Sequence, residues 1–123
     1  MSLFRSPVQL SILAVTFALA ATACGSSSTT APTTPAADVT ISIVGVNAAQ
    51  SFSPNPTTMK VGQSVAFKNN DTIAHDATQD AAKFTTGTLG AGATSAAIAM
   101  PTAGTFTYHC AIHPGMIGTI TVQ

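Results

Sequence analysis

Apolar and polar residues alternate through several short segments in the C-terminal two-thirds of the chain. In the segment 39–46, VTISIVGV, the side chains of Val39, Ile41 and Ile43 fall on one face. The same alternation recurs in SVAFKN (64–69), AAIAM (96–100), TFTYHC (105–110) and IGTITV (117–122). A period of two residues is typical of strands that bury one face, so each of these segments is predicted to be a β-strand.

Turn-forming sequences separate the predicted strands. They are SPNP (53–56), VGQ (61–63), NND (69–71), GTLGAG (87–92) and PTAG (101–104). No stretch of residues 38–123 keeps an apolar period of 3.6 residues, so no amphipathic helix of ordinary length is expected. Short strands with regular turns predict an all-β domain at 38–123, built as a β-sandwich.

The first 23 residues differ in character from the predicted sandwich. Arg5 is followed by an apolar run over 8–23, and small residues stand at its end. This layout is typical of a secretory signal peptide. The run has 16 residues and is interrupted by polar side chains. A membrane-spanning helix needs roughly 20 apolar residues, so we favour a cleaved signal at 1–23 over an uncleaved anchor.

Two kinds of cleavage are compatible with the end of this signal. An ordinary signal peptidase could cut after ALA or ATA. Cys24, however, follows small residues in an arrangement that resembles a bacterial lipobox, although Ala21 stands where leucine is usual. We therefore predict a lipoprotein with a lipidated Cys24, followed by a mobile Ser/Thr/Pro/Ala-rich tether over 24–37. This interpretation predicts a periplasmic or extracytoplasmic membrane-surface protein.

Few charged residues follow the signal. They are Lys60, Lys68, Lys83, Asp38, Asp71, Asp76 and Asp80. Such a composition argues against nucleic acid as a partner, because binding nucleic acid requires a basic surface. The chain has two cysteines. If Cys24 carries lipid, Cys110 has no disulfide partner and is a candidate metal ligand or reactive thiol.

Cys110 belongs to the segment YHCAIHPGM (108–116), which brings three soft donor side chains together. Two residues separate Cys110 from His113, and two more separate His113 from Met116. A sharp turn at the Pro-Gly pair could direct all three side chains to one point. Thiolate, imidazole and thioether donors select copper over magnesium or calcium.

Strand parity separates the adjacent histidine from this set. In TFTYHC, Phe106, Tyr108 and Cys110 share one face, whereas His109 points to the other and is predicted to be a surface residue. His75, just beyond NND, is then the candidate for a ligand from a separate segment. One cysteine and two histidines with a long axial methionine form the arrangement of a blue-copper centre.

Each of these residues taken singly has an ordinary structural explanation. Met116 and Cys110 could be buried core side chains, and His75 could be a polar loop residue. Their combination in a small exported β-domain with matching strand parity favours a metal site.

The chain resembles the plastocyanin-like cupredoxins, and its ligand loop is most like that of amicyanin. The resemblance is carried by FSPNPTTMKVGQSVAFKNNDTIAH (52–75) and GTFTYHCAIHPGMIGTITV (104–122). It implies a two-sheet Greek-key sandwich that binds one copper ion near one end. The implied ligands are His75, Cys110 and His113 in equatorial positions and Met116 in the axial position.

Two neighbours of these ligands depart from the family pattern. Asp76 stands where asparagine usually ties the two ligand loops together with its side-chain amide. An ionised aspartate only accepts hydrogen bonds, so the tie must either be remade with a donor such as a hydroxyl or be lost. The charge is expected to lower the reduction potential. Ile112 stands where proline is typical. A backbone N–H from Ile112 directed at the cysteine sulfur would raise the potential.

The resemblance implies a mononuclear blue (type 1) copper protein that shuttles single electrons between redox partners outside the cytoplasm. Partners are expected to dock on an apolar patch around His113. This patch is expected to comprise Ala111, Ile112, Pro114, Gly115, Met116 and parts of 87–92. The protein is expected to be a monomer. Enzymatic activity is not expected, because four protein ligands close the site and the chain has no glutamate. A copper carrier or storage protein of the cell envelope is the alternative.

Overall fold

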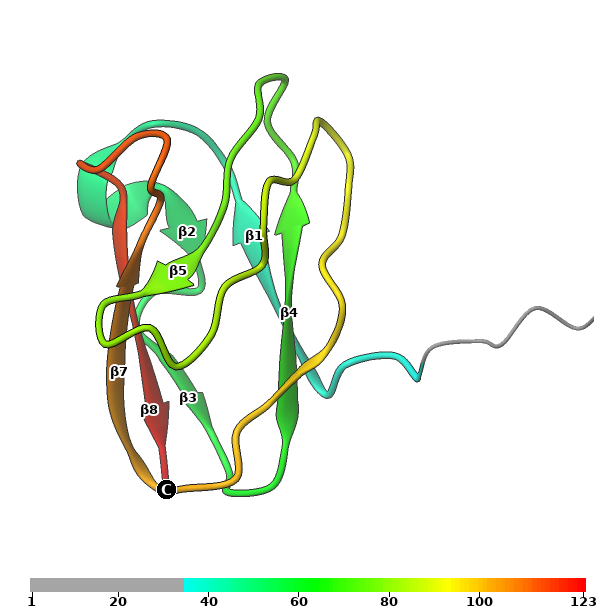
Figure 1. Cartoon of the computed structure of the whole chain (residues 1–123), viewed down its shortest axis with the longest axis vertical. Helices are drawn as coiled ribbons and strands as arrows, with labels where there is room; N and C mark the ends of the chain where they lie inside the picture. Colours follow the sequence, from blue (N-terminus) through cyan, green and yellow to red (C-terminus); the bar gives the residue numbers. More distant parts are fainter. Residues whose placement is uncertain (1–34) are drawn as a thin grey trace, which may run out of the picture. The chain divides into compact units, whose positions relative to one another are not determined.

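A computed structural model describes residues 35–123, which fold into two packed sheets of short strands (Figure 1). Its elements are β1 (Val39–Ile43), the 3-10 helix η1 (Ala48–Gln50), β2 (Phe52–Ser53), β3 (Thr57–Met59), β4 (Ser64–Asn69), β5 (Thr78–Gln79), β6 (Ile98–Ala99), β7 (Gly104–His109) and β8 (Ile117–Val122). The predicted signal, Cys24 and most of the tether lie outside the described residues. Within residues 35–123, no helix is long and apolar enough to cross a membrane.

Each sheet contains four strands whose order departs from the order along the chain. One sheet has the order β2-β1-β4-β6, and the other has the order β3-β8-β7-β5. Strand β1 runs parallel to β4 and β3 runs parallel to β8, whereas β7 and β8 form an antiparallel pair from Gly104 opposite Val122 to His109 opposite Ile117. This architecture confirms the predicted all-β, two-sheet Greek-key sandwich.

The alternating sequence pattern decides which side chains lie between the sheets. Ile41 and Ile43 of β1 and Val65 and Phe67 of β4 are fully buried. Tyr108 of β7 packs edge-on against Phe67, with 5.2 Å between the ring centroids. Burial of these apolar and aromatic side chains is the main favourable contribution to folding.

Strand β1 is shorter than the strand predicted for the segment 39–46. The predicted segment runs to Val46, but β1 ends at Ile43. Val44 and Val46 fall on the opposite parity from Ile41 and Ile43 and are about half exposed. Gly45 has a φ of +139°, a conformation that residues with a Cβ rarely adopt. The strand therefore stops where glycine allows the backbone to leave the sheet.

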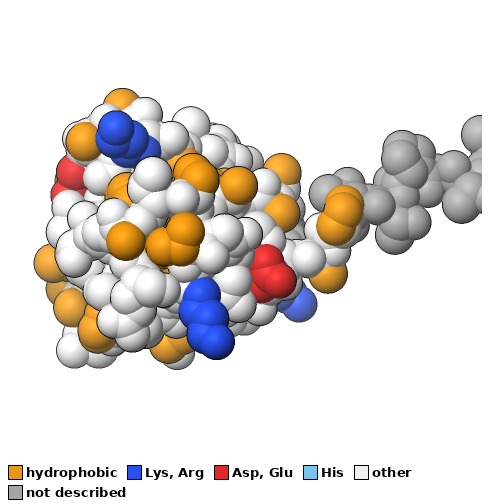
Figure 2. Space-filling model, turned by 90° about the horizontal axis from the view of Figure 1, so that it is seen from below, with side chains coloured by type: hydrophobic (Ala, Val, Ile, Leu, Met, Phe, Trp, Pro, Cys, Tyr) orange, Lys and Arg blue, Asp and Glu red, His pale blue; other side chains and the backbone are white. Residues whose placement is uncertain are grey.

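The two ends of the sandwich carry different segments. The loops that follow β4 and β7 lie at the upper end in Figure 1. The lower end, which Figure 2 shows, displays lysine and aspartate side chains among hydrophobic and uncharged groups. The fold thus brings His75 and Cys110, which are 35 positions apart in the sequence, to the same upper end.

Candidate metal centre

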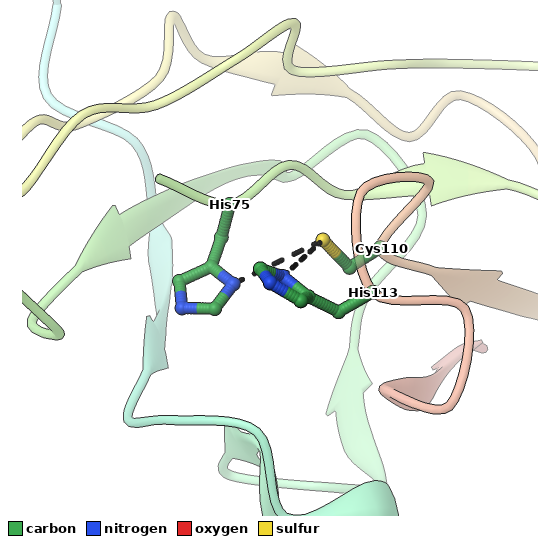
Figure 3. A group of neighbouring side chains, drawn as sticks. All are labelled: His75, Cys110 and His113. Atoms are coloured by element: carbon green, nitrogen blue, oxygen red, sulfur yellow. Dashed lines mark hydrogen bonds between the residues drawn. The ribbon is translucent and has the colours of Figure 1, made fainter. Parts of the chain in front are cut away.

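Three potential metal ligands, His75, Cys110 and His113, meet at this end of the sandwich (Figure 3). Cys110 directly follows β7, and the parity of that strand directs its side chain into the core, where it is fully buried. His113 comes from the turn after Cys110. His75 comes from the segment between β4 and β5, where its backbone pairs with Leu89 through two hydrogen bonds of 3.1 and 2.7 Å.

The separations between the donor atoms match those of ligands that share one ion. Sγ of Cys110 lies 3.9 Å from Nδ1 of His75 and 3.8 Å from Nδ1 of His113. All three donor atoms lie within 4.8 Å of one another. Bonds of about 2.3 Å to sulfur and about 2.0–2.1 Å to nitrogen, at an angle of about 120°, separate the two donors by about 3.8 Å. The donor set therefore fits a metal ion as it stands.

Met116, the predicted fourth ligand, is fully buried at the end of the same turn. Its N–H donates to the carbonyl of His113 at 2.9 Å, and its carbonyl accepts from the N–H of Cys110 at 3.1 Å. These two hydrogen bonds hold the three loop residues in one closed turn. The burial of Met116 also corrects the expected apolar patch, because this side chain does not reach the surface.

The imidazole of His75 is held on both sides. Its Nδ1 faces Cys110, and its Nε2 lies 2.8 Å from Oδ2 of Asp71. A carboxylate accepts a hydrogen bond from Nε2 only when that atom carries the proton, which leaves a free lone pair on Nδ1 for a metal. Hydrogen bonds from His75 and Thr72 hold the pKa of the Asp71 carboxyl below its usual value.

The thiol of Cys110 has competing influences on its ionisation. Burial, together with the side chain of Asp76, raises the pKa of Cys110 above its usual value. The N–H of Asp76, 3.4 Å from Sγ, acts against this rise because it stabilises the thiolate. The N–H groups of His113 and Ile112 act in the same direction as that of Asp76. Metal ions bind cysteine as the thiolate, so these three N–H groups favour the form that binds.

Asp76 ties the two ligand loops together, but through a different donor from the one expected. Its Oδ1 accepts the backbone N–H of Ala111 at 2.7 Å, and its Oδ2 accepts the hydroxyl of Thr78 at 2.7 Å. The tie is therefore remade with a donor, as expected, but this donor is a backbone N–H, and the hydroxyl of Thr78 bonds to the other carboxylate oxygen. Burial raises the pKa of Asp76, but the hydrogen bonds from Thr78, Cys110 and Ala111 outweigh burial and keep the pKa below its usual value.

His109 lies apart from the donor set, as strand parity predicts. Its Nδ1 lies 2.7 Å from Oδ1 of Asp80, and both side chains are substantially exposed. The metal-ligating group found in residues 35–123 does not include it. His109 is therefore a surface residue paired with a carboxylate.

Comparison with known proteins agrees with this geometry. The sequence matches the Cupredoxin-like domain family over residues 10–122. The chain belongs to the cupredoxin-like family. This cupredoxin is 34% identical over 98 residues to a plastocyanin of Scenedesmus fuscus, and the alignment covers 70% of the cupredoxin and 100% of the plastocyanin. Cupredoxins bind one copper ion, and the four side chains that form a potential copper site here are His75, Cys110, His113 and Met116.

Solved structures share the fold of this cupredoxin. A purple cupredoxin from Nitrosopumilus maritimus superposes with a TM-score of 0.62 at 26% identity, covering 70% of our chain and 100% of that protein. A copper-containing nitrite reductase from Thermus scotoductus gives 0.61 at 33% identity, but the match covers 69% of our chain and only 22% of the reductase. A reduced amicyanin variant gives 0.59 at 20% identity, covering 69% and 81% of the two chains, and this likeness concerns the fold alone.

Two residues of the centre were missed by sequence reasoning. Asp71 and Asn69 were interpreted only as parts of the NND turn. Asn69 is fully buried, and its Nδ2 donates to the carbonyls of Ile73 at 2.7 Å and Leu89 at 2.9 Å. An acidic residue four positions before a candidate ligand histidine was the available signal for Asp71. Asn69 gave no signal beyond its place in the turn.

Proposed function

We propose that this cupredoxin is a blue (type 1) copper protein that carries single electrons between redox partners outside the cytoplasm. The observation that supports this best is the prearranged donor set, in which Sγ of Cys110 already lies 3.9 and 3.8 Å from the two histidine Nδ1 atoms. When bound, copper supplies the one-electron couple. The chain's part is to keep the ligand positions nearly the same in both oxidation states, so that little reorganisation accompanies each transfer.

The surroundings of the ligands favour this rigidity. His75 is fixed through its backbone by Leu89 and through its ring by Asp71. The loop of Cys110 is tied to the segment of His75 by the bond from the N–H of Ala111 to the Asp76 carboxylate. A ligand set held by the protein from several directions changes little when the charge of a bound ion changes.

Electrons would enter and leave through His113. This ligand is partly exposed, whereas the side chains of His75 and Cys110 are fully buried. Ile112, the neighbour of His113, is 46% exposed, and Ala111, Pro114 and Gly115 are exposed as well. Such an uncharged, apolar surface suits brief docking with a redox protein, with an association rate that depends weakly on salt.

The closed donor set favours electron transfer over catalysis. Four protein ligands leave no open coordination position for a substrate, and the chain has no glutamate for acid–base work. The nitrite reductase likeness covers 22% of that enzyme and gives no support for enzymatic activity here. We therefore propose a carrier without enzymatic activity, and we expect it to act as a monomer.

The N-terminal sequence supports action outside the cytoplasm. A signal over 1–23 would export the chain, and lipid on Cys24 would anchor it to a membrane surface through the tether over 24–37. The mass of the N-terminal peptide of the native protein tests this part of the proposal. A peptide that begins at an unmodified residue rejects lipidation.

The visible spectrum and voltammetry of the copper-loaded protein test the proposed electron-transfer function. We expect an intense blue or purple charge-transfer colour and a reversible one-electron wave, both lost in Cys110→Ser. His109→Asn is the matched control, because this neighbour of Cys110 faces away from the site and its loss should leave both signals unchanged. Copper uptake without colour or a reversible wave would favour the carrier or storage alternative. No copper uptake would reject a copper function altogether.

A further inference from the structure

We propose that Asp71 is the positioning residue of the copper centre. Its carboxylate holds His75 in the tautomer and orientation that present Nδ1 to copper, and its negative charge favours copper(II) over copper(I). This proposal rests on copper binding at the centre described above, but it does not require that the protein shuttle electrons.

The contact between the two side chains is short and sheltered. Nε2 of His75 lies 2.8 Å from Oδ2 of Asp71, with His75 fully buried and the Asp71 side chain 22% exposed. Hydrogen bonds that involve an ionised partner are stronger than neutral ones. Charges that are partly buried are also screened less by salt than charges on the open surface.

Hydrogen bonds that do not involve His75 fix the backbone and the carboxylate of Asp71. The N–H of Asp71 donates to Oδ1 of Asn69 at 2.9 Å, and the N–H of Thr72 donates to Oδ1 of Asp71 at 2.7 Å. These bonds leave Oδ2 for His75. The fully buried Asn69 also donates to the carbonyl of Leu89, whose backbone pairs with that of His75. The residues that orient Asp71 are thus connected to the backbone that carries the ligand.

This arrangement decides which ring nitrogen can bind the metal. A neutral imidazole carries its proton on either Nδ1 or Nε2, and the hydrogen bond made by one nitrogen determines the state of the other. Within residues 35–123, the hydrogen-bond acceptor at Nε2 of His75 is the carboxylate of Asp71. Without this acceptor the proton can occupy Nδ1, the atom that faces Cys110, where it would have to be displaced before a metal could bind.

The chain offers a matched control for this pair. His109 and Asp80 form a second histidine–carboxylate contact, with 2.7 Å between Nδ1 and Oδ1, outside the metal centre. Asp80→Asn therefore removes the same type of charge from the same type of contact. It should leave His75 and the donor set untouched.

The experiment compares Asp71→Ala, Asp71→Asn and Asp80→Asn with the unaltered chain. Long-range ¹H–¹⁵N spectra of the copper-free proteins report the tautomer of His75, and chelator competition reports the dissociation constants of copper(II) and copper(I). We expect the Nε2–H tautomer in the unaltered chain and a mixture in Asp71→Ala, with copper(II) affinity reduced about 10- to 100-fold. Asp71→Asn keeps an acceptor without the charge, so it should retain the tautomer, weaken copper(II) more than copper(I), and raise the potential.

The possible outcomes distinguish the role of Asp71 from the proposed electron-transfer function. An Asp71→Ala chain with the original tautomer and the original copper affinities would overturn the role of Asp71, as would equal effects from Asp80→Asn. An unaltered chain that binds copper and shows the Asp71 effects, yet gives no reversible electron transfer, would reject the shuttle and support Asp71. An unaltered chain that binds no copper would overturn both.

Discussion

Replacing Gly118 with alanine is expected to destabilise the domain strongly, because the added methyl group has no room. Gly118 of β8 stands opposite Tyr108 of β7 in the antiparallel pair. A Cβ at this position would lie 2.2 Å from Cζ and 2.4 Å from the hydroxyl oxygen of the tyrosine. Ordinary van der Waals contact begins at 3.4 Å, so the ring would have to move by more than an ångström.

The ring has little freedom to make such a movement. Tyr108 is 1% exposed, and its centroid lies 4.8 Å from that of Phe52 and 5.2 Å from that of Phe67, both in edge-on packing. Forcing extra volume into a packed core typically costs 1–3 kcal/mol, and the locked ring favours the upper value of about 3 kcal/mol. For a domain of this size each kcal/mol lowers the melting temperature by about 4–8 °C, so we expect a decrease of about 12–24 °C.

Thermal and urea unfolding of the copper-free chain measure this effect without a contribution from metal binding. Gly90→Ala is the control, because a Cβ there meets nothing within 4 Å and the residue has no positive φ. In a Tyr108→Ala background, the Gly118→Ala change should cost almost nothing, which gives a coupling energy of about 3 kcal/mol in a double-mutant cycle. A Gly118→Ala protein that melts within a few degrees of Gly90→Ala would refute the argument.

Three further predictions concern the copper centre and the core beneath it. Asp76→Asn should raise the reduction potential by roughly 40–170 mV in voltammetry, since an ionised carboxylate at about 4 Å contributes about 1 kcal/mol at the dielectric constant of water and about 4 kcal/mol at an effective value of about 20; an unchanged potential contradicts this. Ile112→Pro removes an N–H that stabilises charge on Cys110 and Asp76, so the potential should fall, and no shift would reject that role. Tyr108→Phe should stabilise the domain by about 1 kcal/mol in urea unfolding, because the buried hydroxyl has no partner within residues 35–123.

Much of the fold and the donor set could be predicted from the sequence because both depend on local periodicity. Period-two alternation identified strands such as β4 and β7 and their buried faces. The same parity placed Cys110 inward and His109 outward, as the structure shows. Cys110, His113 and Met116 lie so close in the sequence that they belong to one turn, whatever the arrangement of the rest of the fold.

The contacts that orient the ligand loops and pack the core could not be predicted in this way, because they join segments that are distant in the sequence. The bond from the N–H of Ala111 to Asp76 joins segments 35 positions apart, and its donor is a backbone group that every residue except proline carries. The approach of Gly118 to Tyr108 depends on the register of β7 and β8, which alternation alone leaves open. The predicted segment 39–46 also overran β1, which ends at Ile43, two residues before the positive φ of Gly45.

The positions of the carboxylates bear directly on the potential of the centre. The chain has four acidic residues, Asp38, Asp71, Asp76 and Asp80. Two of them flank the ligand His75 in the sequence, Asp71 in contact with its ring and Asp76 in contact with the opposite ligand loop. One thiolate and two carboxylates together outweigh the charge of copper(II), so reduction adds an electron to a region that is already negative. Coulomb repulsion therefore favours copper(II), whereas the N–H groups directed at Cys110 favour copper(I), and the potential depends on the balance between these two sets of groups.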